Sequence, residues 1–140
     1  MKLAVDLDGV LGDTRPLWND WLADAARVLD VAGLPEDRRA AAAELDARGA
    51  GNWRALLERF AEERAPVYFR PSAEVSGVLR ALHAEGARIV VVTDAPAELA
   101  RVALRQLGAA RRVDGVVAQP ADDATYVTTR ADFLRLRRSA

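Results

Sequence analysis

The sequence predicts an α/β fold built on a parallel β-sheet. Three apolar, β-prone segments, at residues 3–7, 89–92 and 113–118, are separated by segments whose apolar residues recur at helical spacing. Alternation of strands and helices is typical of parallel sheets. At 140 residues, 51% of them hydrophobic, the chain is long enough for one packed core and too short for two independent ones.

The first predicted strand, residues 3–7, is followed by a helix. Thr14 is placed to cap this helix, Pro16 suits its first turn, and Gly33 lies where the pattern ends. Its apolar positions share one face: Trp18, Trp21, Leu22, Ala25, Val28 and Leu29.

Two further helices are expected before the second strand. Residues 36–48 form an alanine-rich, weakly amphipathic segment that ends at Gly49. Asn52 is placed to cap the next helix, and residues 66–71 read as a linker. The apolar face of that helix holds Trp53, Leu56, Leu57 and Phe60. We expect Trp18, Trp21 and Trp53 to belong to the core rather than to form a platform for substrate.

The remaining elements alternate regularly. Ser72 caps a helix that stops at Gly86 and leads into the strand at 89–92. Asp94 and Pro96 then open a helix before the strand at 113–118. The inward positions of these two helices are Val75, Val78, Leu79 and Leu82 in the first, and Leu99, Val102 and Ala103 in the second.

Two carboxylates one residue apart stand at the end of the first strand. Side chains alternate along a strand, so Asp6 and Asp8 share a side, and Gly9 follows at once. One carboxylate can attack a substrate while the other moves a proton, and two adjacent like charges call for a divalent cation, for which oxygen ligands favour magnesium. Thr93 ends the second strand, and ligands bind at the carboxyl ends of parallel strands. The alternative is a solvated strand end with a turn at Asp8 and Gly9.

Two segments resemble motifs of the haloacid dehalogenase-like (HAD) hydrolase superfamily. The sequence V-D-L-D-G-V-L-G-D at residues 5–13 is similar to the first motif, a strand followed by D-x-D-G-[TV]-L-x-D. The sequence R-I-V-V-V-T at residues 88–93 is similar to the second motif, a buried strand that ends in a hydroxyl. The resemblance extends from residue 2 to about residue 136.

The resemblance implies a three-layer, Rossmann-type parallel sheet with a small helical cap inserted after the first strand. The core would then comprise residues 1–13 and 70–140, and the cap residues 14–69. A cap would decide which leaving groups fit. The alternative is that this block is simply two or three packed helices.

The resemblance also implies a phosphatase that acts on a small phosphomonoester, a phosphorylated metabolite. Asp6 would attack phosphorus and form an aspartyl-phosphate, while Asp8 would protonate the leaving oxygen and then deprotonate water. Magnesium would be held by the Asp6 carboxylate and the Asp8 backbone carbonyl. Thr93 and Asp94, with amides of residues 8–10, would bind the phosphoryl group. An acid at position 8 favours phosphoryl transfer over dehalogenation, because a halide leaves without a proton.

The other two motifs of the family are reduced. The third is a basic residue before a helix, for which Arg130 in the segment T-R-A-D-F-L is the candidate. Arg130 would bind phosphate, the alternative being a solvated arginine at the start of a helix. The fourth is a strand that ends in an acidic pair, and it is missing. Asp122 and Asp123 follow the third strand and are candidates to complete the metal site, the alternative being two solvated loop acids.

Without the fourth strand of the family, the strand at 3–7 should have an open edge, and an unpaired apolar edge invites another strand. The β-prone residues 126–129 could fold back onto it, or a second copy could pair there. We expect the second solution, a homodimer through the edge of the first strand, because the tail is short.

Composition narrows the alternatives. The 20 basic and 21 acidic side chains are interspersed, which argues against nucleic acid or an anionic membrane as partner. The absence of cysteine excludes disulfides and thiolate metal sites. We expect no signal peptide or membrane span, and therefore the cytoplasm. Two interpretations other than an active enzyme remain open. The chain is a catalytically impaired HAD-fold protein with a phosphate-binding or regulatory role, or it is a fragment completed by another chain.

Overall fold

A four-stranded parallel sheet forms the centre of the computed structural model, which describes residues 1–138. The strand order is β3-β2-β1-β4. The strands are β1 (Lys2–Asp6), β2 (Arg88–Val92), β3 (Gly115–Val117) and β4 (Thr125–Val127). In the register of β1 and β2, Asp6 lies opposite Val92, so both strands end at the same edge of the sheet.

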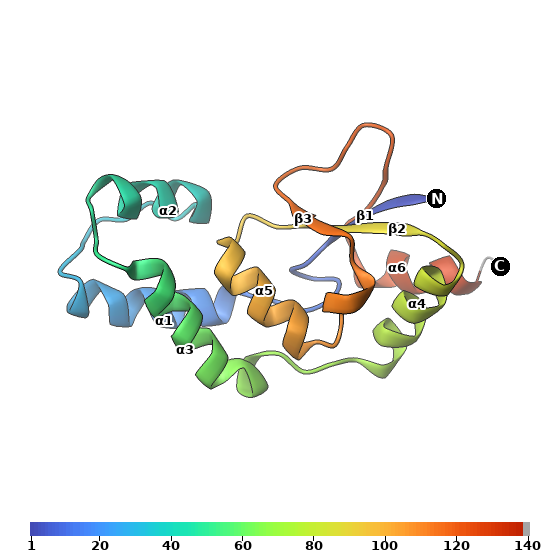
Figure 1. The fold of residues 1–140 in the computed structure, drawn as a ribbon, viewed down its shortest axis with the longest axis horizontal. Coiled ribbons are helices and arrows are strands. Elements are labelled where there is room, and N and C mark those ends of the chain that lie inside the picture. Colours follow the sequence, from blue (N-terminus) through green and yellow to red (C-terminus); the bar gives the residue numbers. More distant parts are fainter. Residues whose placement is uncertain (139–140) are drawn as a thin grey trace.

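The helices fall into two groups (Figure 1). The first group is the helical insert after β1, which consists of α1 (Arg15–Val28), α2 (Arg38–Ala47) and α3 (Trp53–Tyr68). The second group begins with α4 (Ala73–Ala84), which precedes β2. After β2 come α5 (Ala97–Gln106), the short 3-10 helix η1 (Ala110–Arg112) and, beyond β4, α6 (Arg130–Arg138). The α/β class, the parallel sheet and the helical insert after the first strand are confirmed.

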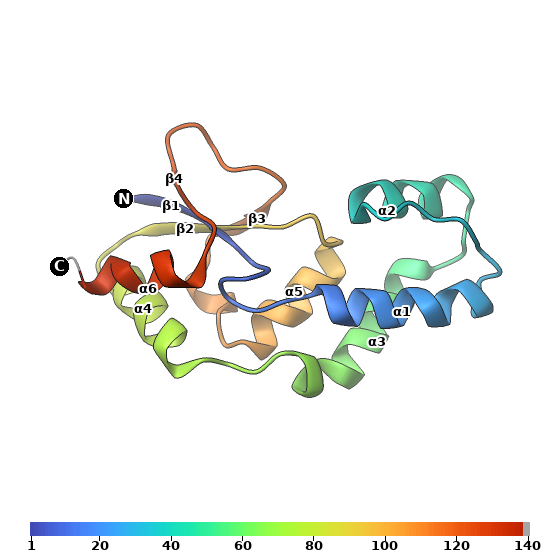
Figure 2. The same ribbon diagram turned by 180° about the vertical axis from the view of Figure 1, so that it is seen from behind.

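The two faces of the sheet are covered differently. In both views α4, α5 and α6 lie on one face, while residues 118–124 cross the other face without a helix (Figures 1 and 2). Side chains alternate along each strand, so every second one faces the helices. The strand side chains that face the helices belong to one buried core, together with Leu79, Val102 and Phe133 of the helices. These strand residues are Leu3, Val5, Ile89, Val91 and Val127.

The first strand has no open edge. β4 pairs with β1 in parallel, on the side away from β2, with Leu3 opposite Thr125 and Val5 opposite Val127. The expectation of an unpaired edge is therefore wrong, and the reason for a homodimer through that edge is removed with it. The tail solves the problem because it buries apolar groups of its own as it folds back: Val127 is 5% exposed and Phe133 of α6 is fully buried.

The three tryptophans form the centre of the helical insert. Trp21 packs between Trp18 and Trp53, with ring centroids 5.3 and 5.9 Å apart, and all three side chains are buried. The indole nitrogen of Trp53 donates a hydrogen bond of 2.8 Å to Asp46 of α2. The expectation that these rings are core is confirmed.

Helix ends differ from the sequence prediction in two respects. α3 continues through Pro66 to Tyr68, because the buried Ala65 and Phe69 anchor its last turn and the Phe69 amide donates to the Ala65 carbonyl at 2.8 Å. Ser72 caps α4 as expected, whereas the Thr14 side chain does not cap α1 and the Asn52 side chain does not cap α3. None of the helices within residues 1–138 combines the length and apolar character that crossing a bilayer requires.

Candidate active site

The carboxyl ends of β1 and β2 carry the candidate site. Asp6 is the last residue of β1, Asp8 follows two residues later, and Thr93 and Asp94 follow β2 directly. These four residues line one open depression of about 300 Å³. Its other lining residues are Arg39, Val92, Ala118, Gln119 and Tyr126. The structure therefore brings together the two carboxylates and the hydroxyl that the sequence pattern places at strand ends.

A tight turn after β1 positions Asp8. The Leu7 carbonyl accepts hydrogen bonds from the amides of Leu11 and Gly12, at 3.2 and 3.0 Å. Gly9 has a φ of 91°, a conformation that glycine adopts without strain, and its amide donates to the Gly12 carbonyl at 2.8 Å. The turn thus uses the Gly9 amide internally, while the Asp8 carbonyl accepts none of the turn's hydrogen bonds.

Three donors surround the Asp8 side chain. Its Oδ1 accepts hydrogen bonds from the backbone amide of Thr14 at 2.7 Å and from the Thr14 hydroxyl at 2.8 Å. Its Oδ2 accepts one from Arg38 Nη2 at 2.6 Å. Thr14, expected as a helix cap, uses its fully buried side chain here instead. An arrangement made only of donors suits the charged carboxylate, which can only accept.

Arg38, at the start of α2, ties the helical insert to the end of the sheet. Its side chain is 6% exposed and bonds Asp8, Thr14 Oγ1 at 2.6 Å, and Asp94 Oδ1 at 2.5 Å from Nη2 and 3.1 Å from Nε. A buried guanidinium needs such partners, because an unpaired charge there would be costly. Sequence reasoning missed Arg38: next to Arg39 in a polar first turn it looks solvated, and its partners lie 24 to 56 residues away.

Tyr126 of β4 contacts Asp6. The register places Tyr126 opposite Ala4, and its hydroxyl donates a hydrogen bond to Asp6 Oδ1. This bond to a carboxylate raises the pKa of Tyr126 to about 12, so the phenol stays protonated at neutral pH. Sequence reasoning noted Tyr126 only as β-prone. No local pattern links it to Asp6, because the contact depends on how β4 pairs with β1.

Thr93 and Asp94 have different partners. Thr93 Oγ1 accepts a hydrogen bond of 3.0 Å from the Ala95 amide, which fixes the hydroxyl and leaves its hydrogen to donate to a ligand. The Asp94 carboxylate is held by Arg38, so it enters the depression as one half of an ion pair.

Three of the predicted site residues do not line this depression. Arg130 lies beside the turn after β1, where its Nε donates to the Val10 carbonyl at 3.0 Å. Asp123 pairs with Lys2 Nζ at 2.5 Å, and this ion pair lowers the pKa of Asp123. Lys2 is the first residue of β1 and Asp6 is the last, so roughly 13 Å separate Lys2 from Asp6. The structure therefore does not bring Asp122 and Asp123 to Asp6.

The oxygen atoms that could bind a metal at this site fit a loosely held magnesium ion. Within residues 1–138 no cluster of three or more histidine, cysteine or acidic side chains is suited to a metal. The Asp6 carboxylate and the uncommitted Asp8 carbonyl remain as two oxygen ligands. Magnesium commonly keeps several water ligands and is bound through one or two carboxylates with the phosphate of a substrate, so this small set is compatible with it.

Comparison with known proteins identifies the class. The family model for haloacid dehalogenase-like hydrolases matches residues 5–136. The chain therefore belongs to the haloacid dehalogenase-like hydrolase family.

Individual proteins add little to this assignment. A search of curated proteins found no match. Among solved structures, the chain is similar to a HAD phosphatase from Thermococcus onnurineus, with 21% sequence identity and a TM-score of 0.49. The match covers 84% of this chain and 61% of that one, so the chain spans less than two thirds of its length.

Proposed function

We propose that the protein hydrolyses a small phosphomonoester with magnesium, through an aspartyl-phosphate on Asp6. The observation that carries the proposal is the single depression lined by Asp6, Asp8 and Thr93 at the ends of two adjacent strands. Membership of the hydrolase family supports hydrolysis. An acid at position 8 supports phosphoryl transfer, because an alkoxide leaving group needs a proton.

Asp6 is the nucleophile in this mechanism. Tyr126 holds one of its oxygens, which orients the carboxylate so that the other can attack phosphorus in line with the leaving oxygen. The Thr93 hydroxyl, fixed by the Ala95 amide, donates to a phosphoryl oxygen. The phosphorus–oxygen bond to the leaving group breaks as the bond to Asp6 forms, and water then attacks phosphorus and releases phosphate and free Asp6.

Asp8 moves the proton in both steps. In the first it gives a proton to the leaving oxygen, and in the second it takes one from the attacking water. The three donors around Asp8 match the charged form needed in the second step. While Asp8 is protonated in the first step, Arg38 keeps a carboxylate partner in Asp94.

Magnesium would be held by the Asp6 carboxylate and the Asp8 carbonyl. When bound, it supplies positive charge that stabilises the transferring phosphoryl group. Because the described residues offer no further acidic ligand, we expect weak affinity and a requirement for millimolar magnesium.

Hydrolysis of p-nitrophenyl phosphate, with and without magnesium, tests the proposal. We expect magnesium-dependent turnover that falls by about a thousandfold or more in Asp6→Asn, because the amide keeps the shape and loses the attacking charge. Asp122→Asn, an exposed acid outside the depression, is the matched control and should retain full activity. Equal rates for Asp6→Asn and the parent would exclude the covalent mechanism.

A phosphate-binding protein without turnover is the second candidate. The small ligand set for magnesium favours it, because a pocket can bind an anion while a poorly held metal fails to support the chemistry. Phosphate or beryllium fluoride with magnesium should then raise the melting temperature by mass action, although the protein hydrolyses nothing.

A further inference from the structure

Arg39 is a cation at the site that has no acidic partner among the residues that the structure describes. The helical insert carries eight arginines, six of which form ion pairs with carboxylates: Arg15, Arg27, Arg38, Arg48, Arg54 and Arg64. Arg39 and Arg59 form none with any carboxylate of residues 1–138. Arg59 lines a separate groove between α1 and α3, whereas Arg39 lines the depression that holds Asp6 and Asp8.

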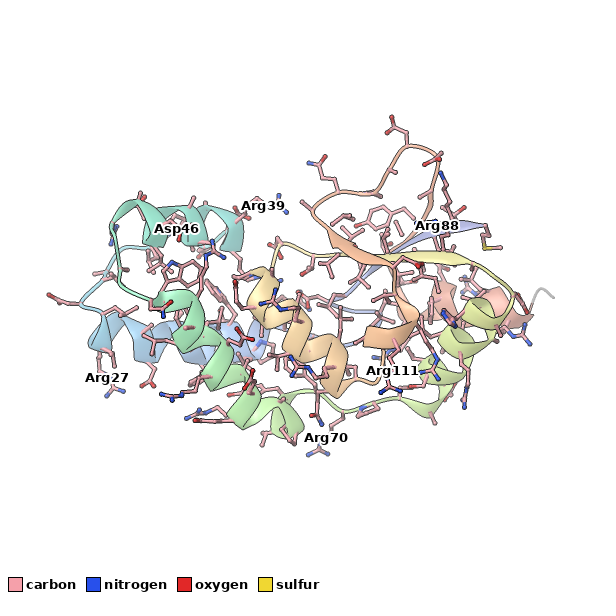
Figure 3. All side chains as sticks on the ribbon, in the orientation of Figure 1. Arg27, Arg39, Asp46, Arg70, Arg88 and Arg111 are labelled. Carbon is pink, nitrogen blue, oxygen red and sulfur yellow. The ribbon has the colours of Figure 1, made fainter. Side chains whose placement is uncertain are left out.

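Arg39 also borders a second depression next to the first. This neighbour has a volume of about 290 Å³ and shares Arg39, Thr93, Asp94 and Ala118 with the first. Figure 3 shows the Arg39 side chain extending from the start of α2 toward the side of the sheet where residues 118–124 cross. A ligand whose phosphoryl group sits at Asp6 can therefore continue into the second depression past Arg39.

The other charged groups of the second depression already have partners. Arg54 is held by Asp46 at 2.9 Å and by Glu98 at 3.2 Å, and Asp94 is held by Arg38. Most of the remaining lining is small or apolar: Ala42, Ala95, Pro96, Ala97, Val116, Val117 and Ala118. This lining suits a short carbon skeleton and leaves the Arg39 guanidinium as the charge to be matched by a ligand.

We propose that Arg39 binds a second anionic group on the alcohol part of the substrate. The substrate class is then a small phosphomonoester whose alcohol carries a carboxylate or a second phosphate. The guanidinium fork matches either group with two parallel hydrogen bonds. The proposal rests on the proposed function, which places the phosphoryl group of the substrate at Asp6. Arg39 is then a specificity residue that takes no part in making or breaking the bonds to phosphorus.

Binding is measured first, by calorimetry in magnesium buffer, in the Asp6→Asn background so that turnover does not consume the ligand. The ligand pairs are 2-phosphoglycerate with glycerol 2-phosphate, and 1,3-propanediol bisphosphate with its monophosphate. In each pair the members differ in the second anionic group, so the two pairs separate carboxylate from phosphate. We expect tighter binding of the more charged member in at least one pair.

Arg39→Gln should weaken that more charged ligand about tenfold and its partner less than twofold, because only the second anion loses its cation. Arg39→Lys should keep most of the preference, since it keeps the charge. Arg59→Gln, the same change at the other unpaired arginine of the insert, should alter neither ligand.

Three results would overturn the proposal: no preference for the more charged ligand, a preference unchanged in Arg39→Gln, or equal weakening of both members of a pair. The last result would place Arg39 on the transferring phosphoryl group. Turnover by the protein with native Asp6 is assayed separately. A charge preference that depends on Arg39, without hydrolysis of any ligand, would sustain the anion subsite and refute the phosphatase.

Discussion

The two halves of the sheet differ in what their strands carry. β1 and β2 are five residues long, and their ends supply Asp6, Asp8 and Thr93. β3 and β4 are three residues long and half exposed, and their contribution to the candidate catalytic groups is the hydroxyl that Tyr126 directs at Asp6. The groups expected to perform chemistry are therefore concentrated on β1 and β2, the catalytic half of the sheet. β3 and β4, the supporting half, mainly complete the sheet.

The short connection between β3 and β4 explains why Asp122 and Asp123 lie near the start of β4 and not at the carboxyl ends of the strands. Residues 118–124 must cross three strand spacings, roughly 14 Å, and also return about 10 Å along the strands. Seven extended residues reach at most about 24 Å. By Asp122 and Asp123 the chain must already be near the start of β4, where Asp123 meets Lys2.

The largest expected effect comes from removing β4 and α6. A chain that ends at Asp122 lacks β4 and α6, which exposes the edge of β1 and the core around Phe133. We expect aggregation or loss of cooperative unfolding, because an apolar edge in the middle of a sheet pairs with other chains. A chain that ends at Leu136 keeps β4 and Phe133 and is the control. Cooperative thermal unfolding of the shorter chain, followed by circular dichroism, would show that the tail is dispensable.

Removal of Arg38 tests the connection between the insert and the catalytic half. Arg38→Ala leaves the Asp8 and Asp94 carboxylates without their shared cation, and we expect a loss of about 1 to 3 kcal/mol in the free energy of unfolding, reduced from a fully buried case because Asp94 is partly exposed. Arg38→Lys should lose less. Arg27→Ala removes an exposed pair with Asp24 and should cost under about 0.5 kcal/mol. Similar urea midpoints for the two alanine variants would contradict the role of Arg38.

Local patterns predicted the catalytic half, because the features that identify its strands lie within a few residues of one another in the sequence. Strand alternation places Asp6 and Asp8 on one side, and the apolar run before Thr93 identifies its strand; the structure brings all three to one depression. The contacts of Arg38 could not be predicted, because they depend on how α2 packs over the turn after β1. The same holds for the Thr14 side chain, which helix-cap statistics assign to α1 and the fold assigns to Asp8.

The supporting half was harder to predict because its strands are short. Residues 125–127 are too few for periodicity to decide between folding back and pairing with a second copy. Burial of Phe133 against the sheet stabilises the folded-back tail. This burial was hard to predict, because a single phenylalanine in a polar segment is a weak indication of a buried helix face.

Tyr126 links the two halves, so its hydroxyl is the next target. Tyr126→Phe keeps the ring and removes the hydrogen bond to Asp6, and we expect kcat to fall about threefold to tenfold with little change in the melting temperature. Tyr68→Phe is the matched control, because its hydroxyl donates to Asp20 on the surface of the insert. A Tyr126→Phe variant with unchanged kcat would show that Asp6 needs no support from β4.

The smallest effect is expected at the opposite end of the sheet. Asp122→Ala with Asp123→Ala should leave the magnesium dependence of turnover unchanged, because Asp123 pairs with Lys2 roughly 13 Å from Asp6. A higher magnesium requirement in this variant would mean that the segment 118–124 rearranges to bind metal.

The pair with Lys2 should also give Asp123 a small effect of its own on stability. Lys2 holds the pKa of Asp123 below the ordinary value of 3.8, so the pair stabilises the folded state above that pH and ceases to do so as pH falls through the lowered pKa. At pH 7 and low salt, Asp123→Ala alone should therefore melt slightly below the parent. The two curves should converge at pH values below the lowered pKa and also in 1 M salt, because the charges are exposed and screened. A difference in melting temperature that persists under both conditions would show that Asp123 stabilises the fold by something other than this ion pair.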